Sequence, residues 1–130
     1  MEKAKVYFTK KIAPESLLAL YEKMGVSLPG KVAVKLSTGE AGNPNYLNPD
    51  LIKDLVQKVN GTIVECNTAY QGKRYCAQDH YKVAEEHGFT KIAPVDIMDE
   101  DGEISLPVVG GKHMKENFVG KNLENYDSVL

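Results

Sequence analysis

The sequence contains few cysteines and no long apolar segment. Its two cysteines, Cys66 and Cys76, are too few for a secreted disulfide scaffold, so we expect a reducing, cytoplasmic setting. No uninterrupted apolar stretch approaches the roughly 18 residues of a membrane-spanning helix. The first dozen residues contain four lysines and lack the apolar core of a secretory signal peptide. We therefore expect neither secretion nor a membrane partner.

The sequence also lacks an excess of either charge. Sixteen Lys and Arg stand against eighteen Asp and Glu, which leaves a formal net charge of -2. This balance provides no overall positive field, so we expect no nucleic-acid partner. Hydrophobic residues make up 42% and charged residues 26% of the 130 residues. Such a composition argues against disorder and, at this length, predicts one compact domain.

Three segments carry helical periodicity, with apolar residues recurring at the three- and four-residue spacing of one helix face. They are residues 14–24, 49–59 and 75–87. Glycine follows each of them, at Gly25, at Gly61 after Asn60, and at Gly88, which is where glycine commonly closes a helix. We therefore predict three helices.

Short β-type runs lie before and between these helices. They cover residues 5–8, 32–36 and 62–66, with a fourth run within 91–98. The alternation of strands and helices predicts right-handed crossovers, with 32–36 and 62–66 as buried, parallel neighbours. We therefore assign the chain to the α/β class, as a Rossmann-like, mainly parallel sheet.

The last third of the sequence predicts a small C-terminal antiparallel meander. Residues 95–97 alternate before a turn at Asp101-Gly102, and the alternation resumes over residues 104–108. Gly110-Gly111 predicts a second turn, which Met114, Glu116 and Phe118 follow. Residues 128–130 resemble the start of a further strand. We therefore expect residues 1–130 to form a single α/β domain that is the N-terminal part of a longer protein.

Two long polar loops, residues 37–46 and 67–74, leave the carboxyl ends of the two expected central strands. Open parallel sheets bind ligands at that edge, where helix N-termini and basic side chains attract anions. We therefore expect a small anionic ligand there. The residues expected to bind it are Lys35, Asn43, Asn67, Tyr70 and Arg74, and those expected to be catalytic are His80 and Glu40.

An alternative reading of these loops stays open. They can be solvated connections in a non-catalytic ligand-binding or assembly module, with Gly and Asn serving only the backbone geometry. The residues alone do not decide between an enzyme and such a module.

Known nucleotide signatures and complete metal sites are absent from the sequence. The first loop lacks a Gly-Lys-Ser or Gly-Lys-Thr sequence, and Gly39-x-x-Gly42 lacks the third glycine of a dinucleotide fingerprint. Cys76 and His80 lie one helical turn apart, a spacing that can hold a metal, but no second pair accompanies them. We therefore expect no metal site, and favour a buried cysteine and a hydrogen-bonded core histidine.

Several ordered motifs resemble one known family. They are Lys5-Val6-Tyr7-Phe8, Thr38-Gly39-Glu40-x-Gly42-Asn43, Asn67-Thr68-x-Tyr70-x-Gly72-x-Arg74, Asp79-His80 and Tyr126-Asp127-Ser128-Val129-Leu130. Together they resemble the proteins called domain of unknown function 362, often labelled uncharacterised iron–sulfur centre proteins. The resemblance covers essentially the whole chain.

The resemblance implies an iron–sulfur-associated protein that takes part in redox chemistry or electron transfer. An iron–sulfur cluster needs about four ligands, usually cysteines, and this chain offers two. We therefore expect no cluster bound by this chain alone, and an iron–sulfur cluster in the C-terminal region of the full-length protein, beyond Leu130. A homodimer stays open as an assembly, and two chains could pool two cysteines each across its interface. The cysteines lack a Cys-x-x-Cys spacing, which argues against such a shared cluster.

Overall fold

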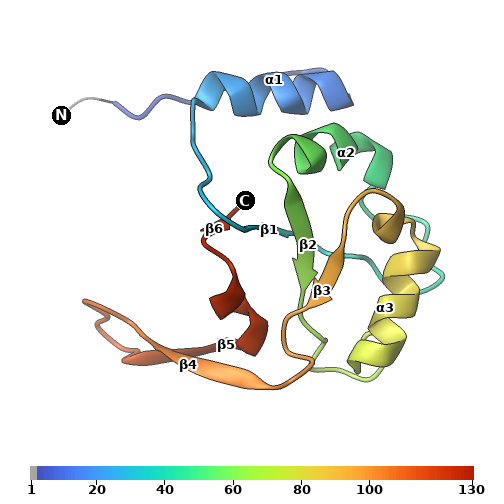
Figure 1. Ribbon diagram of the computed structural model, residues 1–130, viewed down its shortest axis with the longest axis vertical. Helices are drawn as coiled ribbons and strands as arrows, with labels where there is room; N and C mark the ends of the chain where they lie inside the picture. The colour runs from blue at the N-terminus through green and yellow to red at the C-terminus, as the bar shows by residue number, and fades with distance from the viewer. Residues whose placement is uncertain (1–2) are drawn as a thin grey trace.

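The computed structural model describes residues 3–130. Four strands form its main sheet, in the spatial order β3-β2-β1-β6, and every neighbouring pair is parallel (Figure 1). The strands are β1 (Val32–Lys35), β2 (Gly61–Glu65), β3 (Val95–Ile97) and β6 (Ser128–Val129). Val34 lies beside Ile63 in the register of β1 and β2. The predicted α/β class and the predicted pair of central strands are confirmed.

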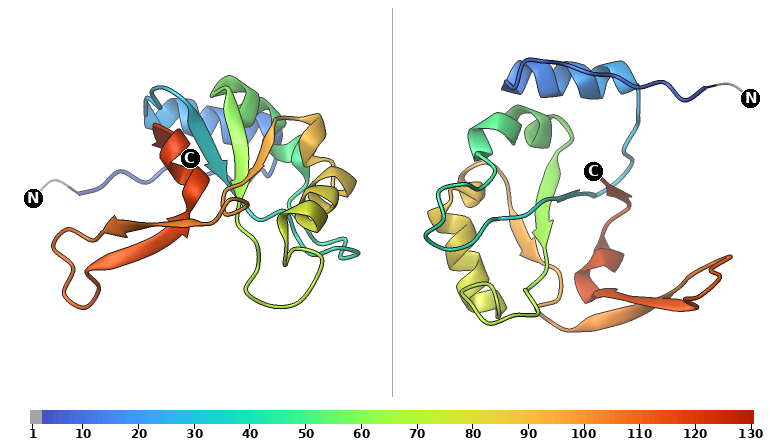
Figure 2. Two further views of the ribbon diagram at one scale, coloured as in Figure 1. Left: turned by 60° about the horizontal axis from the view of Figure 1, so that its bottom comes forward. Right: turned by 180° about the vertical axis from the view of Figure 1, so that it is seen from behind.

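The three predicted helices are confirmed to within two residues at each end. They are α1 (Pro14–Met24), α2 (Pro49–Lys58) and α3 (Ala77–Glu86). α2 begins where the Asn48 side chain accepts a hydrogen bond from the N–H of Asp50 at 2.9 Å. α1 ends at Gly25, which adopts a left-handed conformation with φ of 64°. α1 lies along α2 (Figures 1 and 2).

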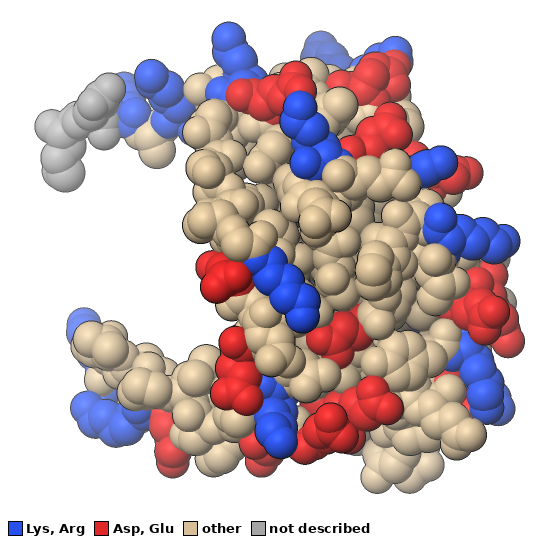
Figure 3. Space-filling view, viewed as in Figure 1, with Lys and Arg blue, Asp and Glu red and all other residues tan. Residues whose placement is uncertain are grey.

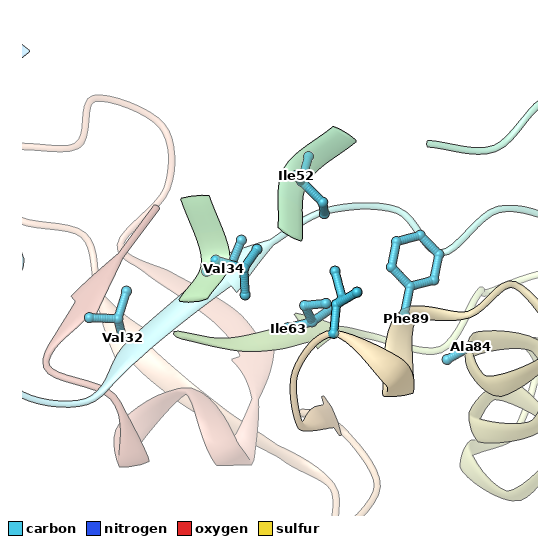
Figure 4. Close-up of a cluster of buried hydrophobic side chains, with 8 residues drawn as sticks. Val32, Val34, Ile52, Ile63, Ala84 and Phe89 are labelled. Atoms are coloured by element: carbon cyan, nitrogen blue, oxygen red, sulfur yellow. The ribbon is translucent and has the colours of Figure 1, made fainter. Parts of the chain in front are cut away.

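One face of the sheet packs against the helices and forms the larger core. Val34 and Ile63 point from the strands towards Ile52 of α2 and towards Phe89 of the short 3-10 helix η1, Phe89–Lys91 (Figure 4). Ile63 and Phe89 have no exposed surface. Because each such side chain contributes about 1.5–3 kcal/mol when fully buried, this face supplies much of the stability that fixes β1 and β2 side by side.

The opposite face of the sheet is covered by the end of the chain. Ala33, Val64 and Met98 are buried there, with Leu123 and Tyr126 packed against them. These two residues belong to or follow the 3-10 helix η2 (Lys121–Asn125), which leads into β6. The C-terminal segment therefore serves as the cover of this face.

The expected strand at residues 5–8 is wrong. Residues 5–8 adopt no strand and lie beside α1, with Val6 and Phe8 largely exposed. A strand that preceded α1 would take the free edge of β1, and β6 occupies that edge through the pairs Val32–Ser128 and Ala33–Val129. Residues 5–8 pair with none of the four strands of the main sheet. An apolar alternation alone does not make a strand, because a strand also needs a partner.

The predicted meander is a single hairpin, and one expected pairing is wrong. β3 does not turn at Asp101-Gly102 to pair with residues 104–108, since it joins β2 in parallel. The antiparallel pair is β4 (Glu103–Pro107) with β5 (Glu116–Gly120), joined through the second predicted turn at Gly110-Gly111, which is confirmed. This hairpin projects away from the main sheet (Figures 1 and 2). The parallel position gives β3 two sources of stabilisation, a ladder with β2 and complete burial of Ile97.

The surface matches the near-zero net charge. Lys and Arg side chains are intermixed with Asp and Glu around the rim of the face in Figure 3. Within residues 3–130, none of the helices has the length and apolarity required to cross a membrane.

Candidate functional site

The loops that follow β1 and β2 meet at the carboxyl edge of the sheet. Because these strands are parallel and adjacent, residues after Lys35 and residues after Glu65 leave the same edge. Arg74, in the second loop, reaches Glu40 in the first and Glu65 at the end of β2. The predicted meeting of the two loops is confirmed at these side chains.

Arg74 is the centre of the cluster, and its guanidinium has two unequal sides. The residue is only 7% exposed. Nη1 donates to Glu65 Oε1 at 3.0 Å, and Glu65 is itself buried. Nη2 donates to Glu40 Oε1 and also lies 3.2 Å from the Tyr70 hydroxyl. One side of the guanidinium is therefore fixed by an internal carboxylate, and the other is held by a residue at the surface.

Glu65 connects Arg74 to the rest of the edge. Its second oxygen, Oε2, accepts a hydrogen bond from Lys35 Nζ at 2.8 Å. The cluster thus contains two cations, Lys35 and Arg74, and two carboxylates, Glu65 and Glu40. Its formal charge is zero while Glu40 is in place.

Glu40 is the exposed member of this cluster. Its side chain is 41% exposed. One oxygen, Oε1, accepts from both Arg74 Nη2 and the Tyr70 hydroxyl. The hydrogen bond from Arg74, followed by that from Tyr70, lowers the pKa of Glu40, and the Glu40 carboxylate raises the pKa of Tyr70. At neutral pH Glu40 is therefore an anion and Tyr70 a neutral donor.

Thr38 holds the first loop in place through three contacts. It has no exposed surface. Its hydroxyl lies 2.9 Å from His80 Nε2, its carbonyl oxygen 2.7 Å from His87 Nδ1, and its N–H donates to Glu65 Oε1 at 3.4 Å. Both histidines come from α3 or its last turn. The backbone two residues before Glu40 is thus tied to α3 and to the same carboxylate that holds Arg74.

His80 lies behind the site. It is completely buried, and this burial, followed in the same direction by the positive charge of Arg74, lowers the pKa of His80. The favoured core histidine, hydrogen-bonded to Thr38, is therefore observed. Cys76 is exposed rather than buried, because it precedes the first turn of α3 instead of lying on its inner face.

The side chains of two predicted binding residues have no hydrogen bond to Arg74 in the structure, and each has another partner. Asn67 donates from its backbone N–H to Asp99 Oδ1 at 2.9 Å. Asn43 is exposed, and its side-chain oxygen accepts from the N–H of Asn45 at 2.9 Å in a local turn. The structure brings together Lys35, Glu40, Tyr70 and Arg74. Asn43 is hydrogen-bonded to Asn45, and Asn67 to Asp99.

Residues 32–130 match the family model described as Domain of unknown function (DUF362). The chain belongs to the DUF362 family. The match begins at the first residue of β1 and contains every residue of the cluster described above. No curated protein and no solved structure matches this chain. The family resemblance predicted from the motifs is confirmed.

Three side chains that hold the site of this DUF362 chain in place were not predicted from its sequence. They are Thr38 and His87, which bond to each other, and Glu65, the carboxylate that Lys35 and Arg74 share. The sequence does contain an indication of the role of Glu65. It is a carboxylate in an otherwise mostly apolar strand, and carboxylates are seldom buried unless they are paired. The bond between Thr38 and His87 joins residues 49 positions apart. No local pattern indicates that pair.

Unpartnered polar atoms single out the same region. Buried side-chain atoms without a hydrogen-bond partner, among residues 3–130, are Asn67 Oδ1, Arg74 Nε and His80 Nδ1. Buried polar groups are nearly always hydrogen-bonded, so each exception requires an explanation. Here all three come from the loop before α3 and the first turns of that helix.

An iron–sulfur cluster does not fit the described residues. Within residues 3–130, no group of three or more His, Cys, Asp or Glu side chains could hold a metal ion. Cys66 is half-buried, and this burial raises the pKa of its thiol, while Cys76 is exposed; both are free. A thiol with a raised pKa is a poor metal ligand at neutral pH, because thiolates are the coordinating form.

Proposed function

We propose that this DUF362 chain binds a small oxyanion at Arg74, by exchange with the Glu40 carboxylate. The observation that carries the proposal is the incomplete hydrogen bonding of Arg74. Glu40 offers Arg74 a single oxygen, and Arg74 Nε keeps no partner although it is buried. A better acceptor than Glu40 would therefore satisfy both donors.

The covalent geometry of arginine explains why an oxyanion suits this position. The Nε–H bond and one Nη–H bond point to the same side of the guanidinium plane, so two oxygens of one carboxylate or phosphate can accept both. Glu65 holds Nη1 and fixes the orientation of the plane. Arg74 is thus oriented before a ligand arrives, which lowers the entropic cost of binding.

Charge balance supports the exchange. When the Glu40 side chain turns out to solvent, Lys35 and Arg74 face only Glu65, which leaves one net positive charge. An arriving anion restores neutrality. Glu40 can leave because its side chain is half-exposed, whereas Glu65 is buried and cannot.

The two predicted catalytic residues have different positions in this proposal. Glu40 meets the ligand directly, since it competes for the same donors. His80 acts as a positioning residue through Thr38, because it has no exposed surface. The redox chemistry that the family resemblance implies needs an electron carrier, so our proposal for these residues is restricted to binding and holding the anion.

The competing function is a structural clasp in a non-catalytic assembly module. The same contacts tie the loop after β1 to the loop after β2, which favours that role as well. In a clasp, Glu40 is the intended partner of Arg74, and no ligand takes its place.

Calorimetric titration of acetate and inorganic phosphate into four proteins separates the two functions: wild type, Glu40→Gln, Arg74→Lys and the control Lys58→Gln. Lys58 pairs with the exposed Glu22 of α1, away from the site. We expect Glu40→Gln to bind anions about two- to fivefold more tightly, since the competing charge is gone. Arg74→Lys should bind anions at least about tenfold more weakly, because lysine keeps the positive charge but lacks the two parallel N–H donors of the guanidinium. Unchanged anion binding in Glu40→Gln, with a lower melting temperature, would establish the clasp.

A further inference from the structure

We propose that the anion taken up at Arg74 is a small monocarboxylate, and that the site discriminates against sulfate and the phosphate dianion. This inference rests on the exchange proposed above and adds the chemical class of the ligand. Its basis is the set of groups that surround the guanidinium.

Glu40 is an internal template for the ligand. It is a planar carboxylate that already accepts hydrogen bonds from Arg74 Nη2 and the Tyr70 hydroxyl. A ligand carboxylate that repeats these contacts and turns its second oxygen to Arg74 Nε would use every donor on that side. The space that Glu40 vacates is therefore that of a carboxylate.

The loop backbone cannot retreat to admit a bulkier tetrahedral group. Thr38 is bonded through its N–H, its carbonyl and its hydroxyl. Gly39 approaches Tyr46 so closely that an added Cβ would lie 2.4 Å from the Tyr46 Cβ. Tyr46 in turn stacks on His87, with ring centroids 3.7 Å apart. Exchange at Arg74 thus moves the Glu40 side chain and leaves its backbone in place.

The charges around the site determine how much negative charge a ligand can bring to it. They come from five elements: Lys35 of β1, Glu65 of β2, Tyr70 and Arg74 of the following loop, His80 of α3, and Asp99 after β3. His80 is neutral at pH 7 because burial lowers its pKa, and Tyr70 stays protonated because Glu40 raises its pKa while it is bound. Once Glu40 leaves, one uncompensated cation remains in the ion-paired cluster. Asp99 lies outside these ion pairs and adds a negative charge beside His80.

A dianion would therefore bring one negative charge too many. The excess would face the Glu65 carboxylate across the buried Arg74 guanidinium. Like charges held close together disfavour each other. A monocarboxylate brings the cluster back to neutrality.

The room beside the cluster limits the size of the ligand. The chain neighbours of Glu40 and Arg74, Ala41 and Lys73, line a hollow of about 130 Å³. Its other lining residues are Asp79, Lys82, Val83 and Glu86. Pockets for drug-sized molecules span about 300–1,000 Å³. The hollow suits a body of a few heavy atoms on the carboxylate.

Competitive titration with acetate, sulfate and inorganic phosphate at constant ionic strength tests this class, in the wild type and in Glu40→Gln. We expect acetate to bind at least about tenfold more tightly than sulfate in both proteins. Phosphate should weaken between about pH 6.5 and about pH 8 as it becomes a dianion, while acetate stays unchanged. Sulfate or dianionic phosphate binding as tightly as acetate would overturn the carboxylate assignment and leave the exchange proposal intact. No anion binding in either protein would overturn both.

A matched pair of variants checks the role of Asp99. Asp99→Asn removes a charge that faces the site, and Asp101→Asn removes a charge from the exposed turn nearby. Asp99→Asn should raise the affinity for sulfate more than the affinity for acetate. Asp101→Asn should leave the ratio of these two affinities unchanged. The same sulfate-to-acetate affinity ratio in the wild type and in both variants would contradict the charge argument.

Discussion

His87 Nδ1 donates a hydrogen bond to the backbone carbonyl oxygen of Thr38 at 2.7 Å, across 49 residues of sequence. This contact joins the C-terminal end of α3 to the loop that carries Glu40. The Nδ1 atom must carry the proton, since a carbonyl oxygen can only accept. The bond therefore sets the tautomer of His87 as well as the position of the loop.

Replacement of His87 by Phe tests this contact. Phe keeps a ring that can stack on Tyr46, but leaves the buried Thr38 carbonyl without its donor. We expect the free energy of unfolding in urea to fall by about 1–3 kcal/mol. His113, which is exposed on the hairpin, provides the matched control. Equal stabilities of His87→Phe and His113→Phe would show that the contact contributes nothing.

Acid should destabilise the protein through His80. Burial lowers its pKa, so the folded state favours the neutral ring. The contribution of His80 is fully present above the unfolded pKa of about 6.5 and is lost as the pH falls through the lower folded pKa. Urea unfolding from about pH 7.5 to about pH 5 should show this loss before the carboxylates begin to titrate. His80→Gln should flatten the curve in this range, and a curve of unchanged slope in that variant would contradict the assignment.

The local elements were predictable from the sequence, and the failures were non-local. Asn48 and Gly25 mark their helix ends through contacts within a few residues, so α1 and α2 follow from pattern alone. The strand at residues 5–8 failed because its edge is taken by β6, from the far end of the chain. No local pattern reveals which of two segments occupies an edge.

The site was predictable in part for the same reason. Glu40, Tyr70 and Arg74 converge because parallel strands end at one edge, and that much follows from topology. Topology does not predict the partners that fix these side chains. The hydrogen bond from Arg74 to Glu65, for example, depends on the direction in which each side chain leaves its backbone. The side chain of Asn43 closes a local turn, so its predicted role in binding stays a prediction.

Tyr126 should anchor the C-terminal segment on β3. Its hydroxyl donates to Asp96 Oδ2 at 2.7 Å, and Asn122 donates to the other oxygen at 2.9 Å. Tyr126→Phe should lower the free energy of unfolding by about 1.5–3 kcal/mol, because the lost bond is to a carboxylate, and should speed hydrogen exchange in β6. Tyr75→Phe is the control, since Tyr75 is exposed. Exchange in β6 at the wild-type rate would argue against an anchor.

Two glycines of the Glu40 loop should respond differently to alanine. Gly39 and Gly42 both have positive φ, 81° and 76°, but only Gly39 lies against another residue. Gly42→Ala should cost about 1–2 kcal/mol from the backbone alone. Gly39→Ala should cost about 1–3 kcal/mol more, because its Cβ would overlap Tyr46. Thermal melts that place the two variants at the same temperature would refute the packing described for this loop.

The Arg74 Nε–H resonance provides the most direct test of anion exchange at Arg74. In a ¹⁵N-labelled wild-type protein, acetate should shift this proton downfield and slow its exchange with water, because the ligand supplies the acceptor that Nε lacks. The same change should occur at lower acetate concentration in Glu40→Gln. A resonance that acetate leaves unmoved in both proteins, while Glu40→Gln stays folded, would contradict the account.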